Sequence, residues 1–359
     1  MKGKILVINP GSTSTKIAMY KDGEPLWVES LSHAPEVLKK FNGPYEQVDF
    51  RRELVLDAAK KHGESLKDLV AVVGRGGPFY PVKSGAYQVS NEMIDVMRNR
   101  PMIARHVSLI AMQIAKEIAD PLGVPAYIYD AVSVDEMIPI VRLSGWKDMP
   151  RRSLGHPLNL RAAAIKFCKQ QGWKHSEKNL LVCHLGGGIS VSIQEKGKLV
   201  DLMGDEEGGF CPERSGGLPM YKFADYCYNS GKDLNHTMKR IMGGGGLMDH
   251  LGTQDAREVE KRIAEGDEYA KLVYEAMALN TAKSIGKLAV VVNGDIDAII
   301  LTGGVAYSKM FTGMIAERVK FIAPVHVVPG ENEMESLAMG VYRVLDGEEQ
   351  AHAFVEEPY

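Results

Sequence analysis

Two arginines in this 359-residue chain lie in glycine-rich surroundings, where a guanidinium could take part in chemistry. Arg75 follows the apolar run Leu69–Val73 and is flanked by glycines, so its side chain could project into a cleft and bind a carboxylate or phosphate in bidentate fashion. Arg214 lies in the irregular stretch Gly208–Gly217, whose glycines suit close approach of the backbone to a ligand. An ordinary surface arginine at a turn, or a solvated charge on a flexible loop, is the alternative for each.

One carboxylate and three histidines are further candidates for chemistry. Asp130 ends a short apolar strand, and the carboxyl ends of strands are where α/β sheets usually hold ligands. It could orient an arginine or the water shell of a metal ion, or it could cap the segment that follows. His156 precedes a predicted helix in an irregular stretch, while His106 opens another predicted helix and His184 ends an apolar run. A loop histidine or a satisfied buried histidine is the competing interpretation for these three.

Glycine-rich turns between apolar runs indicate phosphate binding at three places. The run Lys4–Ile8 leads into Asn9–Lys16 and a second apolar run, which predicts a hairpin whose turn offers N–H and O–H donors. A similar unit returns at Asn179–Ile193, and a third glycine turn, Gly303-Gly304, follows a late apolar run. Two similar units half a chain apart suggest a duplicated architecture. The glycines of the second turn are Gly186, Gly187 and Gly188.

Length and composition limit the classes of protein that this chain can represent. A chain of 359 residues, 45% of them apolar, favours two domains, each with its own core. The formal net charge of −3 gives no reason to expect nucleic acid or an anionic membrane as the main partner. No apolar run approaches the ~18 residues of a membrane span, so a cytoplasmic protein is expected. The four cysteines, which form no CxxC pair, are expected to be structural: Cys168, Cys183, Cys211 and Cys227.

Helix-period segments alternate with short apolar strands, which predicts an α/β fold. The stretch Gly145–Gly155 loses this periodicity and is the expected domain junction and hinge. We therefore expect one domain over residues 1–148, with the C-terminal helical segment 334–359 packing back on it, and a second over residues 149–333. The predicted helices span residues 49–62, 103–119, 158–169, 255–291 and 334–345.

Several common catalytic signatures are absent from the sequence. The chain contains no GxxxxGK[ST], no GxSxG and no HExxH, which leaves P-loop, nucleophile-elbow and zincin chemistry without support. The stretch Gly74-Arg75-Gly76-Gly77 does not have the spacing of a dinucleotide-binding fingerprint.

The order of these loops resembles the superfamily of acetate and sugar kinases, heat-shock ATPases and actin, and in detail the acetokinase family. The resemblance covers nearly the whole chain and would be weak for any one motif alone. It implies two duplicated ribonuclease H-like domains around a central nucleotide cleft, the first on the acyl-substrate side and the second binding the nucleotide. The matching motifs are Asn9–Lys16, Val73–Gly77, Cys183–Gly188, Glu213–Gly217 and Leu301–Gly304.

The resemblance also implies a role for each candidate residue. Arg75 and Arg214 would clamp the anion, and His156 would donate a hydrogen bond to the phosphoryl group in the transition state. Asn9, with Glu333 or Glu335, would serve Mg²⁺, which usually takes few protein ligands. An acidic bias at a helix N-terminus is the alternative for the two glutamates, and a helix cap is the alternative for Asp255. The residues expected at ATP or ADP are Asn9, Ser12, Thr13, Ser14, Lys16, His184, Gly186, Gly187, Gly188, Asp255, Arg257, Gly303 and Gly304.

The substrate class follows partly from an argument about protons. A hydroxyl acceptor must lose a proton to a base, whereas a carboxylic acid is already an anion at neutral pH, since its pKa is about 4 to 5. Paired arginines therefore suit a carboxylate, while Asp130 could be the base for an alcohol. Gly187 stands where acetate kinases usually have Asn, and the segment around His156 lacks their histidine-rich run.

These departures favour the branch of the family that phosphorylates butyrate or a similar short or branched acid. The expected reaction is reversible, in-line phosphoryl transfer between ATP and the acid. Two alternatives are a sugar-type hydroxyl kinase of the same superfamily and a non-enzymatic, ATP-switched binding protein. A homo-oligomer is expected from the family resemblance alone.

Overall fold

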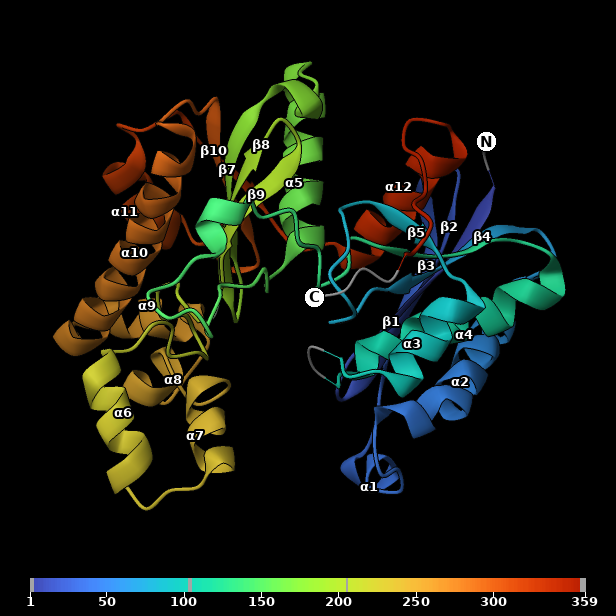
Figure 1. Cartoon of the computed structure of the whole chain (residues 1–359), viewed down its shortest axis with the longest axis horizontal. Helices are drawn as coiled ribbons and strands as arrows, with labels where there is room; N and C mark the ends of the chain where they lie inside the picture. The colour runs from blue at the N-terminus through green and yellow to red at the C-terminus, as the bar shows by residue number, and fades with distance from the viewer. Residues whose placement is uncertain (1–2, 103–104, 205, 356–359) are drawn as a thin grey trace. The chain divides into compact units, whose positions relative to one another are not determined.

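The computed structural model describes residues 3–102, 105–204 and 206–355 and divides into two compact units (Figure 1). Unit 1 comprises Met1–Asp135 and Asn332–Tyr359, and unit 2 comprises Glu136–Glu331. The division therefore falls at residue 135 rather than at 148, because the segment after residue 135 is bonded into unit 2. There the Ile138 N–H donates to Val200 O at 3.0 Å and the Leu199 N–H donates to Glu136 Oε2 at 3.0 Å.

Unit 1 is built on a six-stranded mixed sheet with the order β3-β2-β1-β4-β6-β5. Strands β1 to β3 form an antiparallel meander, β4 and β6 run parallel to β1, and β5 is an antiparallel edge. The strands are β1 (Lys4–Pro10), β2 (Ser14–Lys21), β3 (Glu24–Ser32), β4 (Leu69–Arg75), β5 (Ala86–Gln88) and β6 (Ala126–Tyr129).

Helices cover both faces of this sheet (Figure 1). One face packs Leu6 and Ile8 of β1 against α2 and α4. The other face is covered by α12, whose Leu337 and Val341 are fully buried and which contacts β1, β4 and β6. Both faces being covered explains why β1 reads as a continuous apolar run rather than an alternating one. The helices are α1 (Pro35–Leu38), α2 (Val48–Lys61), α3 (Asn91–Asn99), α4 (Ile110–Ala119) and α12 (Glu333–Leu345).

Unit 2 is built on a five-stranded sheet with the order β11-β10-β7-β8-β9. Again three consecutive strands form an antiparallel meander, and the two later strands run parallel to the first of them. The strands are β7 (Asn179–Leu185), β8 (Ile189–Glu195), β9 (Lys198–Met203), β10 (Ala298–Gly303) and β11 (Val325–Pro329).

The two faces of the second sheet pack against different helices, which lie on opposite sides of it in Figure 1. Leu181 and Cys183 of β7 join the core formed with α10, while Leu180 and Val182 join the core formed with α5. The helices are α5 (Pro157–Gln171), α6 (Met220–Asn229), α7 (Leu234–Ile241), α8 (Leu247–Leu251), α9 (Ala256–Ala264), α10 (Glu268–Ala289) and α11 (Lys309–Val319).

The two sheets share one connectivity, since the order β3-β2-β1-β4-β6 of unit 1 corresponds to β9-β8-β7-β10-β11 of unit 2. The α/β class and the repeated hairpin unit expected from the sequence are thus confirmed. In the part of the chain that the structure describes, no helix is both long and apolar enough to cross a lipid bilayer.

Two predicted helices have different bounds in the structure. The predicted helix 255–291 is wrong as a single element, because Gly266, with φ +94°, separates α9 from α10. The predicted helix 103–119 begins later, since His106 is extended and caps a 3₁₀ turn over Val107–Leu109 that leads into α4. Positions 103 and 104 lie outside the described residues.

Candidate active site

The turn between β1 and β2 has the form expected of a phosphate-binding hairpin. The Gly11 N–H donates to Ser14 O at 2.8 Å, which closes the turn, and Ser12 and Thr13 are exposed at its tip. Lys16 is exposed on β2 opposite Asn9 in the ladder. Backbone and hydroxyl donors are therefore concentrated at one end of the hairpin.

Arg75 is the last residue of β4, and only 6% of it is exposed. Its side chain is held in place by hydrogen bonds. Its Nη1 donates to Asp130 O at 3.1 Å and to Gly76 O at 3.2 Å, and its Nε lies 3.7 Å from Glu333 Oε1. Because β4 and β6 are parallel neighbours, Arg75 and Asp130 reach the same edge of the sheet. The predicted pairing of Asp130 with an arginine exists, but through the backbone carbonyl.

The Asp130 carboxylate is buried and accepts a hydrogen bond from the backbone. The residue is 1% exposed and has a φ of +41°, and its Oδ1 accepts from the Gly85 N–H at 2.7 Å. This bond holds the strand end in a backbone conformation that L-residues rarely adopt.

The structure distinguishes between the two glutamates that open α12. Glu333 faces the site, because its Oε2 accepts from Asn9 Nδ2 at 2.7 Å and its Oε1 faces Arg75. Glu335 instead bonds to Asn332, and that residue caps the helix by accepting from the Glu335 N–H. Asn9, Arg75 and Glu333 thus form one cluster in unit 1.

His106 lies at the start of the 3₁₀ turn, where its Nδ1 accepts from the Ser108 N–H at 3.2 Å. Desolvation and then the charges of Arg75 and Arg51 lower the pKa of His106, although the residue has an exposed surface. Both effects favour the neutral form of the imidazole.

In unit 2 the turn between β7 and β8 lies directly against Arg214. A side chain at Gly188 would meet the Arg214 guanidinium at 2.7 Å, so only glycine allows this approach. The Gly186 N–H donates to Gly188 O at 3.0 Å, and the Glu213 N–H donates to Gly187 O at 3.3 Å. The loop that carries Arg214 is thereby bonded to the turn.

His156 and His184 lie together beside the same turn, with ring centroids 4.4 Å apart. His156 Nδ1 shares a hydrogen bond of 2.9 Å with Ser190 Oγ on β8. His184 is buried at the end of β7, and its Nε2 lies 3.5 Å from Glu331 Oε1. The sequence predicts a role for each of these histidines, but it does not predict that the two rings lie side by side.

Glu331 is a further candidate site residue, which the sequence alone did not indicate. Its Oε1 accepts from the Gly304 N–H at 3.2 Å, and it also borders Gly186. The signal was available, since Glu331 follows β11, which pairs in parallel with the strand that ends at Gly303. The sequence-based prediction for this acidic segment named only Glu333 and Glu335.

Asp255 and Arg257 pair with each other at the start of α9. Asp255 caps the helix by accepting from the Arg257 N–H at 2.9 Å, and the two side chains form an ion pair of 2.6 Å. The hydrogen bond from Arg257 lowers the pKa of Asp255 to about 2. The capping role is present, and the contact of this segment with the nucleotide stays a prediction.

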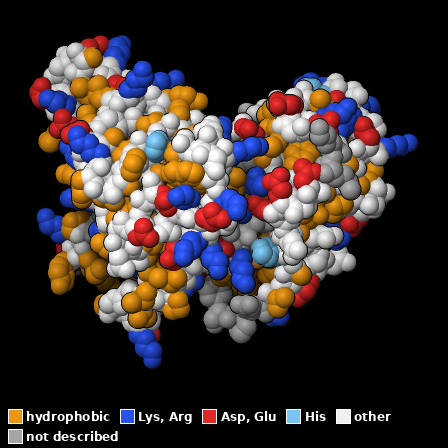
Figure 2. Space-filling view, turned by 90° about the horizontal axis from the view of Figure 1, so that it is seen from above, with side chains coloured by type: hydrophobic (Ala, Val, Ile, Leu, Met, Phe, Trp, Pro, Cys, Tyr) orange, Lys and Arg blue, Asp and Glu red, His pale blue; other side chains and the backbone are white. Residues whose placement is uncertain are grey.

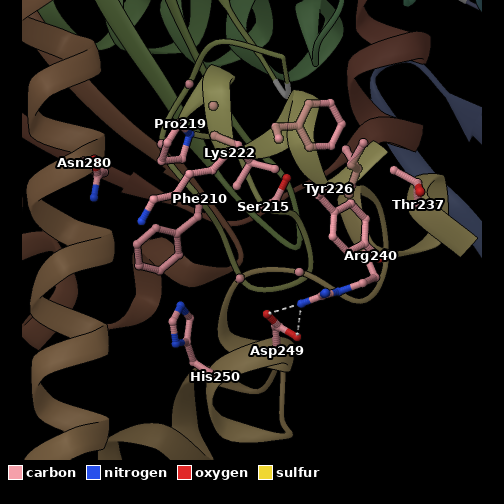
Figure 3. Close-up of a pocket in the computed structure, with 18 residues that line it drawn as sticks. Phe210, Ser215, Pro219, Lys222, Tyr226, Thr237, Arg240, Asp249, His250 and Asn280 are labelled. Atoms are coloured by element: carbon pink, nitrogen blue, oxygen red, sulfur yellow. Dashed lines mark hydrogen bonds and ion pairs between the residues drawn. The ribbon is translucent and has the colours of Figure 1, made fainter. Parts of the chain in front are cut away.

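A separate pocket of about 440 Å³ is lined in part by Phe210, Ser215 and Gly217 of the loop that carries Arg214. In Figure 3, Lys222 extends toward Phe210 and Asn280, and Arg240 is paired with Asp249 across the pocket. None of the site residues expected from the sequence lines this pocket. On the face shown in Figure 2, acidic and basic side chains are interspersed, in keeping with the net charge of −3.

Comparison with known sequences gives full-length matches. Residues 162–324 match the model of the acetokinase family. The chain is 44% identical over 347 residues to the probable butyrate kinase 2 of Caldanaerobacter subterraneus subsp. tengcongensis, covering 96% of this chain and 98% of that protein. It is 42% identical over 353 residues to butyrate kinase 1 of Clostridium acetobutylicum, covering 98% and 99%.

Solved structures show the same fold at low identity. Acetate kinase of Porphyromonas gingivalis superposes with a TM-score of 0.77 at 19% identity, over 96% of this chain and 100% of that one. Acetate kinase of Entamoeba histolytica gives 0.76 at 16%, over 94% and 99%. The ROK hexokinase of Thermus thermophilus gives 0.50 at 14%, over 96% and 99%.

Proposed function

This chain belongs to the acetokinase family, and we infer that it is a butyrate kinase, a phosphotransferase with a carboxyl group as acceptor. The observation that carries this inference is the identity of 42–44% to butyrate kinases over 96–98% of this chain. The reaction transfers a phosphoryl group between ATP and butyrate. The match to the ROK hexokinase, at 14% identity, supports a shared fold and not a sugar as the acceptor.

In unit 1, we assign the anion-binding role to Arg75. Its guanidinium is oriented by two carbonyl oxygens, so a carboxylate or phosphoryl ligand would meet a fixed donor rather than a mobile side chain. Asp130 is a positioning residue, because its carbonyl holds Arg75 and its carboxylate holds Gly85. A butyrate ion needs no base, so this use of Asp130 is compatible with the chemistry.

In unit 2, we assign phosphate binding to the glycine turn and charge neutralisation to Arg214. Phosphoryl transfer depends on positioning and on neutralising charge spread over the equatorial oxygens. Arg214 lies against Gly188, where backbone amides and a guanidinium meet. His156, oriented by Ser190, is assigned a hydrogen bond to the phosphoryl group in transit. The nucleotide's remaining contacts are assigned to Gly303, Gly304 and the Asp255–Arg257 segment.

The cluster of Asn9 and Glu333 fits Mg²⁺ held by few protein groups. An amide oxygen and a carboxylate are oxygen donors of the kind that Mg²⁺ prefers, together with water and substrate phosphates. Among the described residues, no group of three or more His, Cys, Asp or Glu side chains is arranged to hold a metal ion. When bound, Mg²⁺ would supply charge neutralisation at the phosphates. Asn9 and Glu333 would hold its water shell.

Two further assignments belong to the proposal. We place the reaction in the cytoplasm, which suits the four free cysteines of the chain, Cys168, Cys183, Cys211 and Cys227. We also propose that the protein forms a homo-oligomer, by similarity to the family. Selectivity among acids should be modest, because one methylene group is worth only about 1–3 kcal/mol in an apolar pocket.

The test is an acyl-phosphate assay with hydroxylamine trapping, run with ATP, Mg²⁺ and acids from acetate to branched five-carbon acids. Hydroxamate formation should peak at four carbons. Arg75→Ala and Arg214→Ala should each lower kcat/KM by at least about 10³-fold, as expected for arginines that neutralise transferring phosphoryl groups. Matched controls are Arg98→Ala in unit 1 and Arg240→Ala in unit 2, whose guanidinium groups bond to Gln113 and Asp249.

Each result has a definite meaning. Hydroxamate from butyrate that is lost in both site variants and kept in both controls supports the function and the two arginines. No hydroxamate with any acid would overturn the assigned activity. Full activity in either site variant would remove that arginine from the mechanism.

A further inference from the structure

Arg51 is a fully buried arginine that donates hydrogen bonds to the first residues of β2. The turn that precedes them, Gly11–Thr13, is called the phosphate turn below. Arg51 lies on α2 with 0% exposure, and its Nη1 donates to Ser14 O and to Thr15 Oγ1, both at 2.8 Å. Its Nε donates to Gln47 Oε1, one helical turn earlier, at 3.0 Å. One guanidinium therefore joins the helix to the start of β2, where the turn between β1 and β2 closes.

The charge of Arg51 has no counter-ion in the part of the chain that the structure describes. Its three acceptors are a carbonyl, a hydroxyl and an amide oxygen, which are all neutral, and its buried Nη2 has no hydrogen-bond partner. Burial lowers the pKa of Arg51 to about 10, so the group is still charged at pH 7. Burying an unpaired cation costs free energy. A folded protein therefore retains such a cation only when another interaction compensates for that cost.

The neighbours of Arg51 add no negative charge. Thr15 Oγ1 also bonds to His33 Nε2 at 2.8 Å, and burial and Arg51 both lower the pKa of His33. The direction of the bond between Thr15 and His33 depends on the tautomer of His33, and neither group is an anion. The Ser14 carbonyl that binds Arg51 is the same atom that accepts from the Gly11 N–H.

We propose that Arg51 is the positioning residue of the phosphate turn, and that its missing counter-charge is the phosphoryl anion that binds at Gly11–Thr13. Arg51 fixes the turn through Ser14 and Thr15, and its positive charge in a low-dielectric surrounding favours a phosphate anion at the turn. The inference rests on the proposed function, since it assumes that this turn receives a phosphoryl group.

The sharpest test is Gln47→Glu, which places a carboxylate where the amide oxygen now accepts from Arg51. An internal counter-ion should raise the melting temperature in phosphate-free buffer and at the same time reduce the stabilisation by inorganic phosphate by half or more. It should raise KM for ATP at least 5-fold with a smaller change in kcat. A purely structural role of Arg51 predicts the first effect without the other two.

Two variants of Arg51 separate its charge from its geometry. Arg51→Lys keeps the charge but not the planar fork, so it should retain more of the phosphate response than Arg51→Met does. The control is Gln88→Glu, which adds the same charge at an exposed position of β5 in the same unit. This control should leave the phosphate response and KM for ATP at wild-type values.

The melting experiment needs no catalysis, so its outcome is independent of the hydroxamate assay. An equal phosphate response in wild type and Gln47→Glu would overturn the role of Arg51 even in an active butyrate kinase, as would a wild type that phosphate does not stabilise. A lost response in a protein that makes no hydroxamate would retain Arg51 and reject the function.

Discussion

The two glutamates at the start of α12 differ in their hydrogen-bond partners. Glu333 accepts from Asn9 and faces Arg75, while Glu335 bonds to the helix-capping residue Asn332. We expect Glu333→Gln to lower kcat/KM by about 10- to 100-fold, as loss of a group that orients metal-bound water does. It should also raise the Mg²⁺ concentration needed for half-maximal rate. Glu335→Gln is the control, and equal losses in both variants would contradict the assignment.

The buried His33 should make folding stability depend on pH. Its pKa is lowered in the folded protein, so the unfolded chain binds a proton more readily. The unfolding free energy should therefore decrease as the pH falls through the ordinary histidine value of about 6.5, and level off below the folded pKa. His33→Gln should flatten this dependence in urea-unfolding curves measured between pH 8 and 5. An unchanged slope would mean that another group titrates.

The sequence alone identifies those candidate site residues whose neighbours along the chain are unusual. Arg75 and Arg214 stand among glycines, and both glycine turns follow apolar runs, so each was recognisable locally. The bond between Asn9 and Glu333 joins residues 324 positions apart and exists only because α12 packs on β1. Arg51 looks like any charge on a helix, since only the packing of α2 buries it.

The loop that carries Arg214 depends on a second glycine turn for its shape. Gly246 has a φ of +65°, and a side chain there would meet Cys211 O at 1.7 Å. Gly252 has a similar φ of +72° but faces open space. Gly246→Ala should cost more than about 3 kcal/mol of unfolding free energy, against about 1–2 for Gly252→Ala, because only the first adds overlap to strain.

This comparison needs two measurements. Denaturant unfolding gives the difference in free energy, and the acyl-phosphate assay shows whether the residual folded Gly246→Ala protein has lost activity. Similar unfolding free energies for the two variants would mean that the loop relaxes freely around residue 246.

Elements with a clear period and clear ends were predicted well from the sequence. The helices expected at 158–169 and 334–345 correspond to α5 and α12 within a few residues. The expected helix 255–291 fails because apolar periodicity continues through Gly266, where a helix ends and Asp267 caps the next. Periodicity reports a buried face and does not by itself report a break between two helices that share that face.

At the scale of the whole molecule, unit 1 is assembled from two distant parts of the chain. Its sheet comes from the first 135 residues, while α12 covers one face of that sheet. A chain ending at residue 331 should therefore lose the native fold of unit 1 and retain unit 2, whose residues are contiguous. Hydrogen exchange followed by mass spectrometry should show rapid exchange in β1 and β4 and protection in β7 and β10.

A matched truncation is removal of residues 355–359, which leaves α12, the bridge between His352 and Tyr87 and the buried Phe354 in place and should preserve protection in both units. Native protection of β1 in the chain ending at residue 331 would contradict a requirement for α12. The expected junction at 145–155 lay inside unit 2, because Arg151 is bonded there to Asp201, and loop-like composition does not reveal such long-range bonds.

The late position of α12 also has a consequence during protein synthesis. At a rate of roughly 5–20 residues per second, the ribosome needs about 10–42 s to go from residue 135 to the end of α12 at Leu345. During that interval the apolar face of the first sheet, including Ile5 and Val7, has no α12 to cover it. Unit 2 can fold in the meantime, so the unit that begins first is completed last. The nascent chain would then be most vulnerable to aggregation and most in need of chaperones while its own second half is being made.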